Sequence, residues 1–320
     1  MQTSQHWNDY WLHSSSLSSF AEGTAAAGYQ GELLAFWQRY FAALAPAAIL
    51  VDIGTGNGAI AVAARQFSNQ QQLAFDIHAT DAANINPLVT FAHNAQLLDV
   101  LKQIKFYPCC PAEQLPFPDN SINLITSQFA LEYANIELAV TELLRVLAPM
   151  GTLVAVMHHN DTQLAQDCLA GIKVLQLFLE QKPFFECARQ LISSLIQQQL
   201  SAANPAIQRQ CQQHNQQLLT LVSSIKQQLK EEHQLWFTDV MAKVAKLIMQ
   251  PAEGALQALE KYENQYKANL LRLLDQRQAA FNADKLAALQ AFLQQQACHF
   301  SLELLEIENQ LFGQVLIIQK

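Results

Sequence analysis

The sequence predicts an α/β protein whose sheet is mostly parallel and is interrupted in the chain by a long all-helical insertion. Strand-like and helix-like segments alternate over residues 1–159, and only helical spacing is found over 160–297. Two further strand-like runs return at 302–318. Repeated alternation predicts a parallel sheet with right-handed crossovers. Two strands joined by a few residues are most readily antiparallel, so the last two runs complete the sheet as a hairpin.

The strands of the first region are expected where short apolar runs match buried parallel strands. These runs are 49–53, 73–80, 105–110, 122–127 and 151–157, and the closing strands are 302–307 and 315–318. Helices are expected between them, at 59–67, 87–101 and 136–147, after an aromatic-rich helix at 33–44.

The insertion is identified by its spacing of apolar residues. Leu218, Val222, Ile225 and Leu229 recur at steps of four, three and four residues, which favours helices packed side by side in hairpins. Pro183, Pro205 and Pro251 mark breaks between such helices. We therefore expect two domains: one from 1–159 with 298–320, in which 1–45 form an N-terminal lid or helix, and a second from 160–297.

Composition excludes several classes of protein. Hydrophobic residues make up 51% of the 320 residues and charged residues only 14%, which excludes a disordered chain. No apolar run reaches the roughly 18–20 residues that span a bilayer, and residues 1–10 lack the pattern of a signal peptide. None of the six cysteines forms a C-x-x-C pair. We expect reduced thiols, no metal site, no membrane association and a cytoplasmic protein.

Charge argues against nucleic acid as the main partner. The formal net charge is −8, and no basic stripe is found. Residues 160–297 hold 13 Lys or Arg and 12 Asp or Glu, whereas the rest of the chain holds 6 and 15. The insertion is therefore nearly neutral within an acidic frame.

A glycine-rich turn between the first strand and the next helix is the strongest chemical signal. Gly54, Gly56 and Gly58 alternate with other residues, and Asp52 precedes them. Glycine permits positive φ and lets a ligand approach the backbone, while the helix start offers unpaired N–H groups. Ordinary tight turns also use glycine, and the spacing differs from the Gly-x-Gly-x-x-Gly of dinucleotide binders.

Asp81 ends the second predicted strand, 23 residues after Gly58. A carboxylate at that place can accept two hydrogen bonds from a ribose diol. The alternative is an N-cap of the following helix, because Asp is a common cap. With the glycine turn upstream, ribose binding is the favoured interpretation.

Together these motifs resemble class I S-adenosylmethionine-dependent methyltransferases. Asp52-x-Gly54-x-Gly56-x-Gly58 and Asp81 are similar to the first two motifs of that family. Residues 112–121 resemble its stretch after the third strand, and 142–151 its helix and turn before the fifth. The resemblance covers about half the chain and says little of 160–297. It implies a Rossmann-like seven-stranded sheet of order 3-2-1-4-5-7-6, with strand 7 antiparallel and the insertion between strands 5 and 6.

The resemblance also implies a cofactor, S-adenosylmethionine, with S-adenosylhomocysteine as product. The cofactor-binding residues it implies are Asp52, Gly54, Thr55, Gly56, Gly58, Asp81, Ala82, Ala112, Glu113 and Gln128. The glycines would face the methionine and ribose, Asp81 the ribose hydroxyls, and residues 112 and 113 the adenine edge. Pro111 stands where many members carry an Asp that contacts adenine, which weakens the adenine assignment.

Acceptor chemistry is expected where the fourth and fifth strands end. Glu132, Tyr133, His158 and His159 lie there and are the catalytic candidates. Histidine has a pKa suited to general-base work, but two adjacent histidines are also common as surface or capping residues. Glu132 is an acid, a base or a plain carboxylate at a helix start.

Two features leave alternatives open. The aromatic residues Trp7, Tyr10, Trp11, Phe20 and Tyr29 form either a lid over the cofactor or core around the first helix. The leading function is methylation of a small or medium-sized acceptor, with 160–297 as a substrate cap. The alternatives are a protein or RNA methyltransferase that recognises its substrate through the insertion, and a non-catalytic binding or scaffold protein. A homodimer through the insertion is possible in either case.

Overall fold

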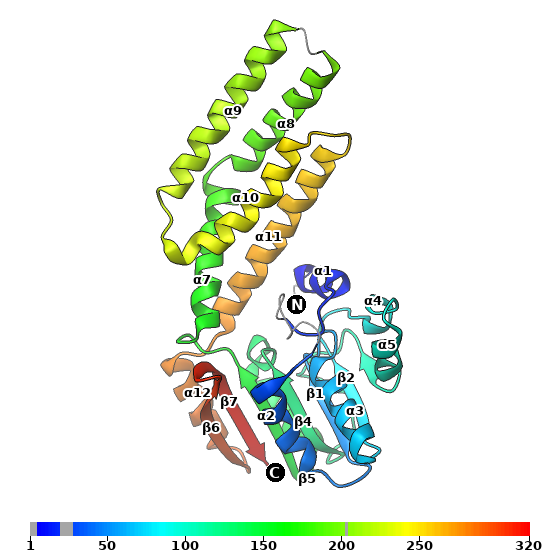
Figure 1. The fold of residues 1–320 in the computed structure, drawn as a ribbon. Helices are drawn as coiled ribbons and strands as arrows, with labels where there is room; N and C mark the ends of the chain where they lie inside the picture. The colour runs from blue at the N-terminus through cyan, green and yellow to red at the C-terminus, as the bar shows by residue number, and fades with distance from the viewer. Residues whose placement is uncertain (1–4, 20–27, 202–203) are drawn as a thin grey trace. The chain divides into compact units, whose positions relative to one another are not determined.

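The structure is a computed structural model that describes residues 5–19, 28–201 and 204–320. The chain divides into two compact units, one of Met1–Ala165 with Gln278–Lys320 and one of Gln166–Arg277. The first unit contains the sheet and the second is helical (Figure 1). The segment 278–297 belongs to the sheet unit, and the predicted division into domains stays a prediction.

The sheet confirms the predicted fold class. Its seven strands follow the order β3-β2-β1-β4-β5-β7-β6, and β7 runs antiparallel to both β5 and β6. The strands are β1 Ile49–Ile53, β2 Asp76–Thr80, β3 Lys105–Tyr107, β4 Ile122–Gln128, β5 Leu147–Met157, β6 His299–Ile307 and β7 Gln310–Gln319.

Helices cover both faces of this sheet (Figure 1). The helices of the sheet unit are α1 Gln5–His13, α2 Gly31–Ala42, α3 Ala59–Gln71, α4 Pro87–Thr90, α5 Ala95–Leu101, α6 Ile136–Val146 and α12 Ala283–Leu293, with a 3₁₀ turn η2 at Leu131–Tyr133. Leu50 of β1 packs in the core with α2 and α3, whereas its neighbour Val51 packs in the core with α6 and α12. Alternation of side chains along each strand thus feeds two separate cores.

One helix differs from the prediction. The segment predicted as a single helix over 87–101 forms α4 and α5, separated by a turn. The Asn94 side chain explains the break, because it accepts a hydrogen bond from Leu97 N at 3.2 Å and caps a new helix.

The second unit holds the remaining helices and its own hydrophobic core. They are α7 Gln163–Gln176, the π-helical turn η3 Leu177–Gln181, α8 Phe184–Leu200, α9 Pro205–Lys226, the 3₁₀ turn η4 Glu231–His233, α10 Gln234–Met249 and α11 Ala255–Ala279. The leucine-rich stripe predicted from spacing is confirmed at Leu218 and Ile225, which are buried in that core. In the part of the chain that is described, no helix is both long and apolar enough to cross a bilayer.

Gly313 allows the closing hairpin to pack on β5. A Cβ at this position would lie 2.7 Å from the Met157 carbonyl oxygen and 3.2 Å from Val156 Cγ1. We therefore expect Gly313→Ala to lower the free energy of unfolding by about 1–3 kcal/mol, as overpacking does. Denaturant unfolding measures this, with Ser301→Ala on the neighbouring β6 as the control. An unchanged unfolding midpoint for Gly313→Ala would contradict the close approach.

Candidate functional site

The loop between β1 and α3 forms a backbone cradle at the carboxyl end of the sheet. Gly54, Gly56 and Gly58 all have positive φ, of 62°, 55° and 98°. Thr55 N donates to Thr80 O at 3.0 Å, which attaches the loop to the neighbouring strand β2. Gly58 then starts α3. The sequence prediction of a tight glycine turn between strand and helix is thus confirmed.

Two of these glycines are required by close neighbours. A Cβ on Gly54 would lie 2.2 Å from Ala130 Cβ, and one on Gly56 would lie 2.5 Å from the indole of Trp11. Neither position therefore has room for a side chain. The positive φ would also strain any residue other than glycine. The backbone of the cradle is approached closely from both sides.

Asp52 braces the cradle from beneath. Its carboxylate accepts hydrogen bonds from Thr55 Oγ1 at 2.6 Å and Thr126 Oγ1 at 2.9 Å, and it is buried. Burial raises the pKa of the Asp52 carboxyl to about 7; the two threonine hydroxyls oppose the shift and the charge of Asp81 adds to it. Thr126, on β4, was not among the residues that the sequence singled out.

Asp81 joins the loops that follow β1 and β2. Its two carboxylate oxygens accept from Gly56 N at 2.7 Å and from Ala83 N at 2.8 Å. The side chain is buried, and this burial raises the pKa of its carboxyl to about 6 despite the two N–H donors. The alternative prediction, that Asp81 is the N-cap of the following helix, is wrong, because Asn86 caps α4. Asp81 instead accepts a hydrogen bond within its own loop and another from the glycine cradle.

Gln128 ends β4 beside the cradle. Its Oε1 accepts from Trp37 Nε1 at 2.8 Å, and the hydroxyl of Tyr29 also hydrogen-bonds to its side chain. Asp52, Gly54, Thr55 and Gln128 line a common cavity with Tyr29 and Phe129, and the cavity volume is about 40 Å³. Trp7, Trp11 and Leu17 from the N-terminal segment line it as well. The structure thus brings the predicted loop residues and the N-terminal aromatics together; Phe20 lies outside the described residues.

The predicted adenine-side residues Ala112 and Glu113, and the predicted cofactor residue Ala82, lie apart from this cavity. Glu113 Oε1 accepts from Asn135 N at 2.9 Å, at the start of α6. Ala112 is buried in the core beneath α6, and Ala82 is exposed. None of these three lines the cavity, so their cofactor role stays a prediction.

Three of the four catalytic candidates form a cluster at the ends of β4 and β5. Glu132 Oε1 accepts from His158 N at 2.7 Å, and the Tyr133 ring meets the His158 ring edge-on, with centroids 6.2 Å apart. The His158 ring stacks on Phe129, with centroids 4.1 Å apart and planes at 2°. Because Phe129 also lines the cavity, this cluster adjoins the cradle. His159 instead bonds to its own turn, where its Nδ1 accepts from Asp161 N at 3.2 Å.

Burial sets the protonation of this cluster. It raises the pKa of the Glu132 carboxyl to about 7, against the hydrogen bond from His158 N and the positive charge of Lys285. It lowers the pKa of the His158 imidazole to about 3, so this ring is neutral at pH 7. Glu132 is thus the group of the cluster whose proton is exchanged near neutral pH.

Several buried polar atoms near the carboxyl end of the sheet have no hydrogen-bond partner among the described residues. They are Asn57 Oδ1, Thr80 Oγ1, Ser127 Oγ and Glu132 Oε2. Thr80 and Ser127 flank Ile53, the last residue of β1, in the register of the sheet. Unpaired buried polar groups are unfavourable, so these atoms are candidates for contact with a polar ligand or with water.

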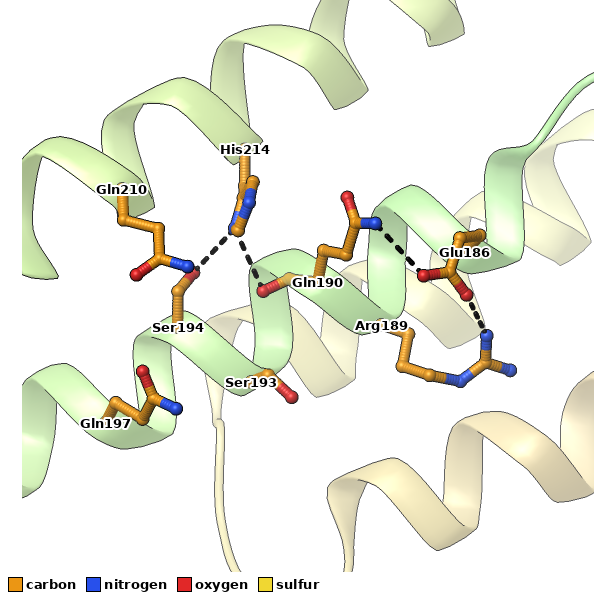
Figure 2. Close-up of a pocket in the computed structure, with 8 residues that line it drawn as sticks. All are labelled: Glu186, Arg189, Gln190, Ser193, Ser194, Gln197, Gln210 and His214. Atoms are coloured by element: carbon orange, nitrogen blue, oxygen red, sulfur yellow. Dashed lines mark hydrogen bonds and ion pairs between the residues drawn. The ribbon is translucent and has the colours of Figure 1, made fainter.

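A second pocket lies within the helical unit, between α8 and α9 (Figure 2). Its volume is about 240 Å³ and its lining is polar. His214 Nδ1 lies 3.1 Å from Gln190 O and 3.3 Å from Ser194 Oγ, and Arg189 pairs with Glu186 at 2.7 Å. This pocket contains none of the residues that the sequence singled out. In the described ranges, no three His, Cys, Asp or Glu side chains gather as a metal site would need.

Comparison with known proteins finds a family match for part of the sheet unit. Residues 51–155 match the family model of the methyltransferase domain. The resemblance to class I S-adenosylmethionine-dependent methyltransferases is thereby confirmed for this segment, and the order of the sheet agrees with it. A comparison with curated proteins finds no match.

Solved structures that are similar to this chain share little sequence with it. A putative S-adenosyl-L-methionine-dependent methyltransferase from Methanococcus maripaludis is 15% identical, with 90% of this chain and 84% of that chain covered and a TM-score of 0.41. A SAM-dependent methyltransferase from Aquifex aeolicus is 18% identical, with 41% and 66% covered and a TM-score of 0.34. A putative methyltransferase in complex with the Trm112 activator from Haloferax volcanii is 22% identical, with 38% and 50% covered and a TM-score of 0.30. This chain therefore spans one half to two thirds of the last two proteins.

The raised pKa of Asp52 has a consequence for stability. Between pH 4 and pH 7 the folded state keeps this proton, whereas the unfolded state, with a pKa of 3.8, has lost it. Stability therefore falls as pH rises through this window, by at most about 1.4 kcal/mol per pH unit for one such group. We expect Asp52→Asn to flatten the dependence, since Asn stays neutral. Urea unfolding of both proteins from pH 4 to pH 7 checks this, and parallel pH profiles would contradict it.

Proposed function

We propose that this chain binds S-adenosylmethionine in the glycine cradle and transfers its methyl group to an acceptor of small or medium size. The observation that carries the proposal is the Asp81 carboxylate, buried against the Gly56 N–H within the segment that matches a methyltransferase domain. A buried carboxylate can accept hydrogen bonds from a ribose diol. A glycine loop beside it lets the rest of the ligand approach the backbone closely.

The residues present fit such a cofactor. Gly54 and Gly56 have no side chain that could cover the backbone of the cradle; Trp11 is the neighbour that packs on Gly56. Asp81 offers acceptor lone pairs for hydroxyl groups, and Asp52 and Gln128 line the adjoining cavity. The unpaired hydroxyl oxygens of Thr80 and Ser127 offer further polar partners at the ends of β2 and β4. When bound, the cofactor supplies an electrophilic methyl group on a sulfonium.

Methyl transfer from a sulfonium is an in-line displacement, which depends mainly on positioning. A proton must be removed when the acceptor is a hydroxyl, an amine or an activated carbon. We propose Glu132 as the group that takes this proton, because its Oε2 is unpaired and its pKa is near 7. His158 is a poor base because its pKa is about 3; its backbone N–H holds Glu132 Oε1 at 2.7 Å instead.

The helical unit is proposed to select the acceptor. Its surface charge is nearly balanced over 160–297, which favours a neutral acceptor over a nucleic acid. A protein acceptor and self-association through the helices remain the alternatives to be tested. Incubation of the purified chain with a labelled methyl donor and fractionated cell extract distinguishes them, because the label is recovered in small molecules, in protein or in RNA.

The cofactor role of Asp81 is testable by calorimetry with S-adenosylhomocysteine. We expect micromolar binding by the wild-type chain. Asp81→Ala should weaken it more than tenfold, since hydrogen bonds to a charged group are worth about 1.5–3 kcal/mol each. Affinity should also rise from pH 5 to pH 7, because the carboxyl of Asp81, with a pKa of about 6, must lose its proton to accept two hydroxyl groups. Unchanged affinity in the variant would exclude the ribose role.

Asp76→Ala is the matched control for Asp81→Ala. Asp76 begins the same strand at its opposite end, where it pairs with Lys105 at 2.7 Å. Its loss should leave the affinity for S-adenosylhomocysteine unchanged.

The role of Glu132 is testable once an acceptor has been identified by the labelled donor. Glu132→Gln keeps an oxygen for the His158 N–H but cannot take a proton. We expect S-adenosylhomocysteine to bind as tightly as before and turnover to fall by about 10²–10⁴-fold. The rise of rate with pH near 7 should disappear in the variant. Glu137→Gln, an exposed change on α6, is the control, and a Glu132→Gln enzyme with the wild-type pH profile would refute the assignment.

A further inference from the structure

The N-terminal strap, which we define as α1 with residues 14–19, lies on the cradle itself. Trp11 is only 8% exposed, and its indole lies where a Cβ on Gly56 would be 2.5 Å away. Trp11 also packs with Ala83 and Ile85, which follow Asp81 in the chain. One aromatic ring therefore covers both loops that Asp81 joins. These are the backbone surfaces that the proposed cofactor requires.

The side chain of Asn57 holds the strap in place. Its Nδ2 donates to Ser16 O at 3.0 Å and lies 3.3 Å from Trp11 O and 3.5 Å from Ser14 O. Asn57 is fully buried, and it belongs to the cradle loop. Its Oδ1 has no hydrogen-bond partner among the described residues. Asn57 therefore holds the strap through its NH₂ group alone, while its Oδ1 has no partner in the described part of the chain. The unpaired oxygen makes the closed arrangement less favourable.

The space beneath the strap is too small for the ligand. The cavity measures about 40 Å³, and Trp7, Trp11, Leu17, Ser18 and Ser19 form one side of it. Sites for cofactors usually enclose about 300–1,000 Å³. The missing volume has to come from movement of a lining element. The opposite side includes Ala59, Ile60 and Phe129, which belong to the main core of the sheet together with Leu17 of the strap. Trp7 and Trp11 belong instead to a small separate cluster, so α1 is the part of the strap with the fewest core contacts to break.

We propose that the N-terminal strap is an autoinhibitory segment that competes with the cofactor for the cradle. Trp11 occupies the surface of Gly56 in the closed state, and Asn57 binds the strap carbonyls. Cofactor binding separates Trp11 from Gly56 and releases the Asn57 side chain. This inference rests on the proposed function, because the competing ligand is the proposed cofactor.

Competition between the strap and the cofactor changes the apparent Kd and the association rate constant. When only a fraction of molecules is open, the apparent Kd rises as the inverse of that fraction. Weakening the strap should therefore tighten binding and speed association. A strap that merely covered a bound cofactor would behave in the opposite way, because its loss would speed dissociation and weaken binding.

The experiment uses the full chain with S-adenosylhomocysteine as the probe, in stopped-flow binding and hydrogen exchange. Trp11→Ala removes the competing ring. Asn57→Ala removes the hydrogen bond to the strap carbonyl of Ser16 but keeps the Trp11 ring. Leu12→Ala is the control, since Leu12 is on the same helix and is 48% exposed. We expect both test variants to raise the association rate constant by about threefold or more, with the control unchanged. In the wild type, amides of residues 5–19 should lose protection when the probe binds.

Two results would overturn the proposal. One is increased protection of residues 5–19 against hydrogen exchange when the probe binds. The other is weaker binding by Trp11→Ala with an unchanged association rate constant. Either result would show that the strap covers the bound cofactor instead of competing with it. If the wild type and both test variants bind the probe and the variants associate faster, the proposed function and the strap are both supported. If all of them bind with the same association rate constant, the proposed function stands and the strap proposal fails. If no variant binds it, the proposed function fails and the inference fails with it.

Discussion

The Asp81 carboxylate accepts one N–H from each of two loops, at Gly56 and at Ala83, and the geometry of the site depends on this pair of hydrogen bonds. Backbone N–H groups are strong donors, and a single buried anion between them fixes the distance between the ends of β1 and β2. Burial raises the pKa of the same carboxyl to about 6, so the brace is fully charged only above that pH. The structural support of these loops and the proposed recognition of the ribose therefore depend on one titratable group.

The two sides of the site have different chemistry. On the cradle side, both carboxylates are paired: Asp52 accepts from two threonine hydroxyls, and Asp81 accepts from two backbone N–H groups. On the side of β4 and β5, Glu132 has one oxygen held by the His158 N–H and one oxygen unpaired. Burial raises the pKa of this carboxyl to about 7. The proposed cofactor side and the Glu132 side adjoin through the ring of Phe129, which stacks on His158 and lines the cavity.

The strap links these two sides to the N-terminus. The Trp7 ring meets the Tyr133 ring edge-on with centroids 5.5 Å apart, while Trp11 covers Gly56. Aromatic side chains bury large areas and contribute strongly to such contacts. The same contacts that stabilise the closed strap reduce the space for a ligand, and the proposed competition couples docking of the strap to cofactor affinity.

The amino-acid sequence by itself determined the order of strands and helices, the glycine turn and the place of Asp81, because these depend on local periodicity and on backbone conformations that only glycine adopts readily. The prediction of one helix over 87–101 was wrong, because the chain forms two short helices there, 87–90 and 95–101. The Asn94 cap between them is a local signal that the surrounding apolar pattern hides. Only the tertiary structure decided that Trp11 rests on Gly56, that Thr126 supports Asp52 and that His158 is buried. Those facts depend on contacts between residues far apart in the chain, and on the burial that sets each pKa, neither of which a one-dimensional pattern records.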